Sequence, residues 1–316
     1  MKGTHMSASE LSQIMEMMAQ GKPDFKDDTP KVRAEFDGLL ASLPVDETVI
    51  FETRTIGGIP GVWVDGARDS DSVLLYLHGG AYVVGTPMGY RSLSSTLARE
   101  SGTALFSPQY RLAPEHAFPA PVDDALAAYR GLLAAGFEPG SIAVAGDSAG
   151  GGLAAALLIA IRDTGLPQPA AAWLLSPWAD LSCSGETMRT KATQDALLDH
   201  EGLSRKAAEY LAGSPADSPL ASPATAELHA LAPLLIHVGS TEILLDDAIR
   251  LAGRAGAAGT SARLVIVPNM FHVWPLFSFM LSEGQDALRE AGLFLANHLQ
   301  SHTGAPSSQQ TKTAVA

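Results

Sequence analysis

The tightest constraint on the fold lies in residues 141–162, where a short strand, a glycine-rich turn and a helix are expected to follow one another directly. Residues 141–145 (SIAVA) are apolar and β-branched enough for a buried strand, and residues 151–162 (GGLAAALLIAIR) are small and apolar enough for a buried helix. The turn between them reads Gly146-Asp147-Ser148-Ala149-Gly150. Glycines are needed there because side chains in so tight a turn would collide with neighbouring backbone.

Ser148 in this turn would present its hydroxyl above the N-terminus of the following helix, where developing negative charge is favoured. A serine held between glycines at a sharp strand-to-helix turn is typical of a catalytic nucleophile. The same residue types also occur by chance in flexible loops. The catalytic interpretation therefore needs a base, an acid and an oxyanion hole elsewhere in the chain.

From residue 73 onward, strand and helix patterns alternate. The expected strands are 73–77, 103–107, 141–145, 170–175, 234–238 and 262–267. The expected helices are 92–100, 122–135, 151–162, 246–253 and 285–299. This alternation predicts an α/β fold with a mostly parallel sheet that helices cover on both faces. It also places active-site residues at the carboxyl ends of the strands.

Other segments depart from this alternation. Residues 8–45 contain two amphipathic helix patterns, and residues 48–64 form a hairpin pattern around Gly57-Gly58. Residues 180–232 contain no strand pattern, which indicates an inserted helical cap rather than a plain loop. Residues 303–316 lack apolar periodicity and are expected to form a disordered tail.

The composition excludes several classes of protein. With 316 residues, 46% hydrophobic and 17% charged, the chain suits a globular protein with one large core. Its net charge of -13 argues against nucleic acid and anionic membrane surfaces as partners. The single cysteine, Cys183, excludes a disulfide within the chain and a cysteine-based zinc site. No apolar run reaches the roughly 18 residues of a membrane span, and the N-terminus does not resemble a secretory signal, so we expect a cytoplasmic location.

The best candidate for the base is His272, which directly follows the last expected strand in Asn269-Met270-Phe271-His272-Val273-Trp274. A lone histidine in a loop is more often a packed side chain than a catalytic one. The position after the final strand favours the catalytic role, because in serine hydrolases of this chain order the histidine comes last. His78 and His116 precede the nucleophile, and His237 falls inside a strand, so these fit less well.

Two carboxylates compete for the role of the acid that supports this base. Glu242 lies where the loop leaves the expected strand 234–238, so its side chain could reach the far ring nitrogen of His272. Asp246 lies one turn further on, at the expected start of a helix. A carboxylate there also has a structural role, because it interacts favourably with the helix N-terminus. We favour Glu242 and retain Asp246 as the alternative.

The expected oxyanion hole follows the strand 73–77 in the run His78-Gly79-Gly80-Ala81-Tyr82. Glycines at this point of the chain let backbone N–H groups turn toward a substrate oxygen. The predicted donors are the amides of Gly79, Gly80 and Ala149. Each such donor typically contributes about 3 kcal/mol of transition-state stabilisation.

Three motifs make the chain resemble the bacterial hormone-sensitive-lipase-like (family IV) esterases of the α/β-hydrolase superfamily. They are residues 78–81 (HGGA), residues 146–150 (GDSAG) and residues 110–121 (YRLAPEHAFPAP), and residues 176–182 (SPWADLS) also match the stretch before that family's cap. The resemblance spans nearly the whole chain. Two positions depart from the pattern: most members carry Asp where Glu242 stands, and Ala81 replaces a glycine. A glutamate can serve as the acid in this fold.

The resemblance implies an α/β-hydrolase core with an eight-stranded, mostly parallel sheet and a helical cap. On this basis residues 1–45 and 183–230 form the cap, residues 46–182 and 231–302 form the catalytic core, and residues 303–316 follow as the tail. It implies hydrolysis of short- to medium-chain carboxylic esters through a serine acyl-enzyme. A homodimer is expected because members of the family are often dimers.

The mechanism expected from these residues requires no metal and no organic cofactor, and its partner is a small-molecule ester. Asp147 and several aromatic side chains are candidates for the substrate pocket, although the aromatic residues could equally belong to the core: Tyr82, Trp178, Trp274 and Phe277. Two alternatives remain open at this point. The same triad could hydrolyse amides, or the chain could be a non-catalytic small-molecule-binding protein on the same fold.

Overall fold

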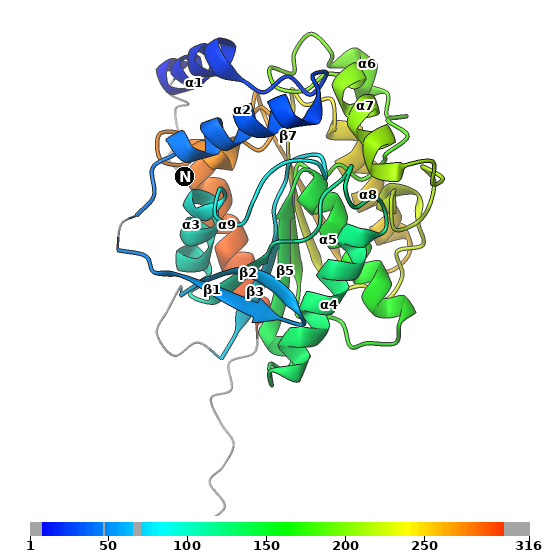
Figure 1. The fold of residues 1–316 in the computed structure, drawn as a ribbon. Helices are drawn as coiled ribbons and strands as arrows, with labels where there is room; N and C mark the ends of the chain where they lie inside the picture. The colour runs from blue at the N-terminus through cyan, green and yellow to red at the C-terminus, as the bar shows by residue number, and fades with distance from the viewer. Residues whose placement is uncertain (1–7, 47, 66–70, 300–316) are drawn as a thin grey trace, which may run out of the picture.

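In a computed structural model, which describes residues 8–46, 48–65 and 71–299, the chain folds around one eight-stranded sheet (Figure 1). The order across the sheet is β1-β2-β4-β3-β5-β6-β7-β8. The strands are β1 (Phe51–Ile56), β2 (Ile59–Val64), β3 (Val73–Leu77), β4 (Ala104–Pro108), β5 (Ile142–Asp147), β6 (Ala172–Leu175), β7 (Leu234–Gly239) and β8 (Ala262–Val267). The eight-stranded α/β fold expected from the sequence is confirmed, and the predicted tail 303–316 lies outside the described residues.

The sheet is parallel except at one edge. β1 and β2 form the predicted hairpin, with Ile56 opposite Ile59 and with Gly57 and Gly58 both at positive φ. A two-residue turn of this kind matches the twist of the strands, and glycine adopts it without strain. β2 pairs antiparallel with β4, and the pairs from β4 through β8 are all parallel. Strands β3 to β7 are completely buried, as expected for a sheet covered on both faces.

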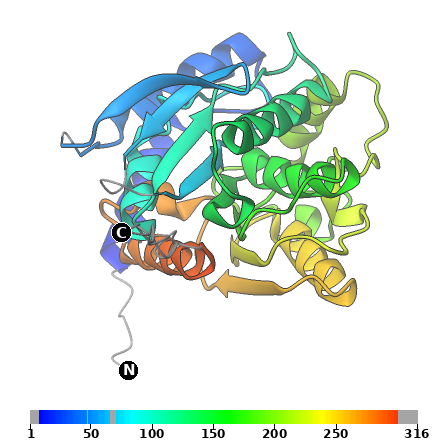
Figure 2. The same ribbon diagram turned by 90° about the horizontal axis from the view of Figure 1, so that it is seen from below.

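Helices cover both faces of the sheet. α3 (Arg91–Ser101) and α9 (Ser282–His298) pack together on one face, while α4 (Ala120–Ala134), α5 (Ala149–Asp163) and α8 (Leu245–Ala257) cover the other (Figure 2). Most boundaries lie within two residues of those predicted. Two helices differ more: α9 begins at Ser282, three residues before the predicted start, and α8 continues past the predicted stop at Gly253 to Ala257. The buried side chains Leu251 and Ala255 hold this last part of the helix against the core.

The remaining helices lie over the carboxyl ends of the parallel strands. α1 (Ala8–Gly21) and α2 (Thr29–Ser42) come from the N-terminal segment, and α6 (Thr187–Thr190) and α7 (His200–Leu211) come from the insertion after β6. Figure 1 shows all four at the same end of the molecule. Among the helices of the described ranges, none is both long enough and apolar enough to cross a membrane.

Polar contacts fasten these end helices to one another and to the core. The guanidinium of Arg33 on α2 donates to the carbonyls of Val83 and Ala113 and pairs with both oxygens of Glu115. The ammonium of Lys206 on α7 is fully buried and donates to the carbonyl of Asp27, the hydroxyl of Thr29 and the carboxylate of Glu209. Segments about 180 residues apart in the chain are therefore joined over the end of the sheet.

Two helical glycines allow a test of how closely the β1–β2 hairpin packs against α4. A Cβ on Gly131 of α4 would overlap the backbone of Gly57, whereas a Cβ on Gly253 of α8 would meet no atom within 4 Å. We expect Gly131→Ala to lower the free energy of unfolding by about 1–3 kcal/mol, because the hairpin must move away. Gly253→Ala should instead raise it by roughly 0.5–1 kcal/mol through helix propensity. Urea unfolding measures both, and equal effects of the two substitutions would contradict this packing.

Candidate active site

Ser148 occupies the sharp turn that the sequence predicts between β5 and α5. Its φ of 53° and ψ of -123° are rare for a residue with a side chain, and its amide donates to the carbonyl of Leu175 at 2.8 Å. Glycines flank it for steric reasons: a Cβ on Gly146 would overlap the carbonyl of Gly150, and a Cβ on Gly150 would overlap that of Leu77. The turn therefore exposes the hydroxyl of Ser148 at the carboxyl end of the sheet.

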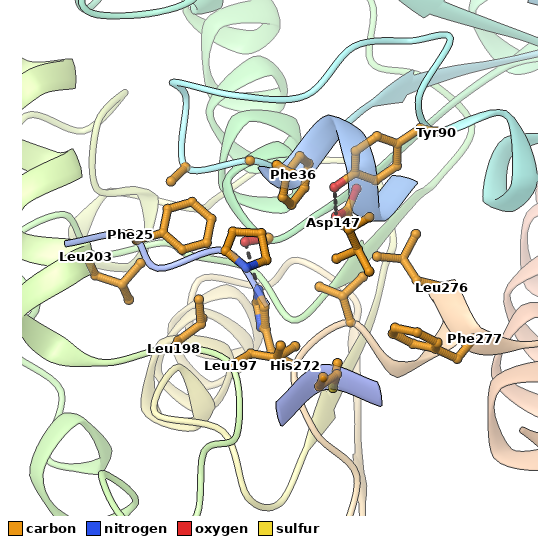
Figure 3. Close-up of a pocket in the computed structure, with 17 residues that line it drawn as sticks. Phe25, Phe36, Tyr90, Asp147, Leu197, Leu198, Leu203, His272, Leu276 and Phe277 are labelled. Atoms are coloured by element: carbon orange, nitrogen blue, oxygen red, sulfur yellow. Dashed lines mark hydrogen bonds between the residues drawn. The ribbon is translucent and has the colours of Figure 1, made fainter. Parts of the chain in front are cut away.

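The three side chains proposed from the sequence as nucleophile, base and acid form one chain of hydrogen bonds. The hydroxyl of Ser148 lies 2.9 Å from Nε2 of His272, and Nδ1 of His272 lies 2.8 Å from Oε2 of Glu242. An ionised carboxylate only accepts hydrogen bonds, so Nδ1 carries the proton and Nε2 is free to accept from the serine. In Figure 3, the dashed line at His272 marks the hydrogen bond between its Nε2 and the hydroxyl of Ser148.

Asp246 does not reach this site. It lies in the first turn of α8, and its carboxylate accepts a hydrogen bond from the amide of Thr187 at 3.1 Å. This contact ties the start of α8 to the insertion, and the place of Asp246 in the first turn of α8 is the helix-terminus position considered for it in the sequence. The structure thus brings Glu242, and not Asp246, to His272.

The surroundings of His272 favour its protonated form. Burial alone would lower the pKa of this histidine, but the hydrogen bond and the negative charge of Glu242 raise it above its ordinary value. The charges of Asp195 and Asp147 act in the same direction. A buried imidazole with a raised pKa can take a proton from a serine hydroxyl and hold it as an imidazolium.

The carboxylate of Glu242 is completely buried and is supported on both oxygens. Oε2 faces His272, while Oε1 accepts from the hydroxyl of Ser176 at 2.7 Å and from the amide of Gly239 at 2.5 Å. Gly239 must be a glycine because a Cβ there would overlap the carbonyl of Met270. Burial of a charged group is tolerated only when such partners compensate for the lost water.

One predicted oxyanion donor is wrong. The amide of Gly79 donates to Oδ1 of Asp147 at 2.8 Å, and a single N–H so directed is not available to a substrate. The next two residues both have positive φ angles, 119° for Gly80 and 51° for Ala81. Both residues line the pocket beside Ser148. Within the described residues, the amides of Gly80, Ala81 and Ala149 have no hydrogen-bond acceptor.

Asp147, which precedes the nucleophile, holds the loop that contains these amides. Besides Gly79, its carboxylate accepts from the hydroxyls of Tyr76 at 2.6 Å and Tyr90 at 3.1 Å. Burial raises the pKa of Asp147 from 3.8 to about 6, although the three donors partly oppose the shift. In the next peptide group, the carbonyl of Gly79 accepts from Nδ1 of His78 at 2.7 Å. Asp147 and His78 therefore hold the two peptide groups on either side of Gly79.

The pocket beside Ser148 is predominantly apolar and encloses about 630 Å³ including its mouth. In Figure 3, Phe25, Leu198 and Leu203 lie on one side of His272, and Tyr90, Leu276 and Phe277 lie on the other. The lining residues from the end helices and their loops are Met18, Pro23, Phe25, Phe36, Leu39, Leu197, Leu198 and Leu203. Two segments far apart in the chain therefore supply about half of the wall.

Two of the five predicted pocket residues, Asp147 and Phe277, line this pocket. The predictions for Tyr82, Trp178 and Trp274 are wrong, because these aromatic side chains are buried in the packing around the site. Tyr82 stacks on Tyr210 at 3.9 Å, and the indole of Trp274 donates to the carbonyl of Glu283.

Sequence reasoning missed Phe25, Tyr90 and the leucines at 197 and 198. The only signal available for Phe36 and Leu39 was their helical stripe. No group of three or more His, Cys, Asp or Glu side chains that could bind a metal ion occurs in the described part of the chain.

Comparison with known proteins places the chain in a family. Residues 74–276 match the family model described as the alpha/beta hydrolase fold. An acetyl-hydrolase of Streptomyces hygroscopicus is 50% identical over 241 residues, which cover 76% of this chain and 81% of that protein. An esterase of Acinetobacter venetianus is 31% identical over 265 residues, covering 83% and 87% of the two chains.

A solved structure extends this similarity to the fold. The crystal structure of an esterase from the bacterial hormone-sensitive lipase family has a TM-score of 0.89 and 43% sequence identity, and the match covers 94% of this chain and all of that one. The sheet order, the turn at Ser148 and these similarities all indicate the same fold family. The chain therefore belongs to the α/β-hydrolase fold family and, within it, to the bacterial hormone-sensitive-lipase-like esterases, which are carboxylic ester hydrolases.

Proposed function

We propose that the protein hydrolyses carboxylic esters through a serine acyl-enzyme, with Ser148 as nucleophile, His272 as base and Glu242 as the supporting acid. The observation that carries this proposal is the pair of hydrogen bonds from Ser148 to His272 and from His272 to Glu242, at 2.9 and 2.8 Å. The relatives named acetyl-hydrolase and esterase support the reaction class. Nucleophile, base and orienting acid in this geometry, together with an oxyanion hole, support acyl transfer.

In the first half of the reaction, the oxygen of Ser148 attacks the ester carbonyl carbon while Nε2 of His272 takes the hydroxyl proton. The carbonyl oxygen becomes an oxyanion, for which the amides of Gly80, Ala81 and Ala149 are the available donors. His272 then gives its proton to the departing alkoxide, and the acyl group stays on the serine. In the second half, water repeats these steps and releases the carboxylic acid.

The apolar wall favours an ester with a short to medium acyl chain. The polar groups of the pocket are gathered at Ser148, His272, Asp147 and Tyr90, and apolar side chains form the rest of its wall. We further propose that residues 1–45 and 183–230 act as a cap over the core, since the side chains of Phe25, Phe36 and Leu203 complete the pocket. The expected homodimer and cytoplasmic location stay predictions.

A series of nitrophenyl esters tests this function. The purified protein should hydrolyse acetyl to medium-chain esters, with kcat/KM falling once the acyl chain exceeds the pocket. Ser148→Ala removes the nucleophile and should reduce turnover by about six orders of magnitude, as triad knock-outs do in serine proteases. Turnover that survives this substitution would rule out the proposed mechanism.

The supporting acid can be tested by one pair of carboxylate substitutions. Glu242→Gln should lower kcat by up to about four orders of magnitude, because the imidazolium loses its charge partner. Since Glu242 raises the pKa of His272, and the base must be neutral to accept a proton, the acid limb of the kcat/KM profile should also move to lower pH.

Asp246→Asn is the matched control, because an amide oxygen can still accept from Thr187. Its kcat and its pH profile should stay close to those of the wild type. A large loss in Asp246→Asn together with a mild effect of Glu242→Gln would show that the acid has been assigned to the wrong residue.

Asp147 holds the proposed oxyanion loop through its hydrogen bonds, and substitutions at this residue test that role. Asp147→Ala leaves Gly79, Tyr76 and Tyr90 without their acceptor, and we expect kcat to fall about 100-fold, the loss typical of a disturbed oxyanion hole. Asp147→Asn keeps an acceptor oxygen for Gly79 and should cost much less. Initial rates with a nitrophenyl ester measure both, and equal losses in the two variants would contradict a role through hydrogen bonding.

The free energy of unfolding of Asp147→Asn should also depend on pH differently from that of the wild type. The folded-state pKa of Asp147 is raised to about 6, so its ionisation costs stability increasingly as the pH rises from about 4 to about 6. Asp147→Asn has no such proton. Its free energy of unfolding relative to the wild type should therefore improve by roughly 2 kcal/mol between pH 4 and pH 7.

A further inference from the structure

Ser176, the residue that follows β6, combines backbone strain with complete burial. Its φ is 46° and its side chain is 0% exposed. A non-glycine residue in the left-handed region costs of order 1–3 kcal/mol and persists where the surrounding structure holds it there. Glycine would adopt the same conformation without strain. Serine is therefore less favourable than glycine for the backbone at this position, and a role of its hydroxyl would offset that cost.

The hydroxyl of Ser176 lies between the loops of the proposed acid and base. Its one hydrogen goes to Oε1 of Glu242 at 2.7 Å, because an ionised carboxylate cannot donate in return. Its oxygen accepts from the amide of Val273, the residue after His272, at 3.3 Å. The backbone fixes the serine in turn, since its amide donates to the carbonyl of His237 on β7 at 2.7 Å. One side chain thus contacts both loops that carry the proposed acid and base.

A glutamate needs this support more than an aspartate would. Its additional methylene adds a rotatable bond, so the carboxylate plane is less constrained by the backbone. The donors on Oε1, from Ser176 and Gly239, leave Oε2 directed at Nδ1 of His272. With no exposed surface, this carboxylate is out of contact with the solvent that could otherwise replace a lost donor.

We propose that Ser176 is a positioning residue for ester hydrolysis, which fixes the carboxylate of Glu242 and couples it to the loop of His272. The inference rests on the proposed function, because it assumes that Glu242 supports His272 during turnover. Ser176 does not touch the substrate pocket in the described structure. Its effect on the reaction therefore runs through the orientation of Glu242 and leaves substrate binding unchanged.

Two substitutions separate the hydroxyl from the strain. Ser176→Ala removes the hydroxyl and keeps the strained backbone, while Ser176→Gly removes both. We expect kcat for a nitrophenyl ester to fall about 10- to 100-fold in both variants with little change in KM, the loss expected for one hydrogen bond to a charged group. Ser176→Gly should be the more stable of the two in thermal unfolding.

Ala212→Gly is the matched control for relief of strain. Ala212 ends α7 with φ 47°, is exposed and lies outside the pocket lining. This variant should be at least as stable as the wild type and should keep its kcat. A kcat in Ser176→Ala or Ser176→Gly equal to that of the wild type would overturn the proposal.

A double-mutant cycle with Glu242→Gln distinguishes positioning from a general structural defect. If Ser176 acts through the charged carboxylate, Ser176→Gly should cost less than about threefold in kcat once Glu242 is already neutral. Additive losses in the double variant would overturn the proposal, because they would show that Ser176 acts independently of Glu242.

The low-field proton resonance of Nδ1–H of His272 gives a readout without turnover. It should be present in the wild type and in Ala212→Gly, and weakened or lost in both Ser176 variants. If the wild type shows this resonance but no Ser148-dependent hydrolysis, the proposed function fails while the positioning role is still judged by the resonance. An unchanged resonance in the Ser176 variants would overturn that role.

Discussion

The site depends on one electrostatic constraint, the complete burial of the carboxylate of Glu242. A buried charge is stable only if hydrogen bonds and an opposite charge replace its water. The partners are Gly239, the last residue of β7, Ser176 directly after β6 and His272 in the loop after β8. The carboxylate therefore brings the ends of three neighbouring parallel strands together, and the raised pKa of His272 follows from the same contact.

A second buried carboxylate organises the other half of the site in a different way. Asp147 faces only neutral donors, namely the amide of Gly79 and the hydroxyls of Tyr76 and Tyr90. Burial raises its pKa to about 6, although these donors and the charge of His272 oppose the shift. Its hydrogen bonds fix the conformation of the loop after β3, so that the following amides of Gly80 and Ala81 are left for the pocket. Of the two carboxylates, one holds the proposed base and the other shapes the loop with the proposed oxyanion donors.

The sequence predicts those features that depend on local rules. The strand-turn-helix at Ser148 follows from glycines that the backbone itself requires, and the position of His272 follows from chain order. What could not be predicted depends on side-chain and backbone orientation. The donor error at Gly79 arose because the motif does not say which amide Asp147 occupies. Trp178 and Trp274 were wrongly placed in the pocket, since apolar character alone does not tell a buried aromatic side chain from a pocket wall.

Chemistry and specificity are carried by different parts of this chain. Ser148, Glu242 and His272 follow the carboxyl ends of β5, β7 and β8 and are joined by hydrogen bonds. Much of the pocket wall instead comes from the N-terminal segment and the insertion, through side chains such as Phe25 and Leu203. These segments are joined to each other and to the core by exposed or half-exposed ion pairs as well as by the buried Lys206. We infer that substitutions in the wall change which ester is accepted while leaving the hydrogen bonds between Ser148, His272 and Glu242 intact.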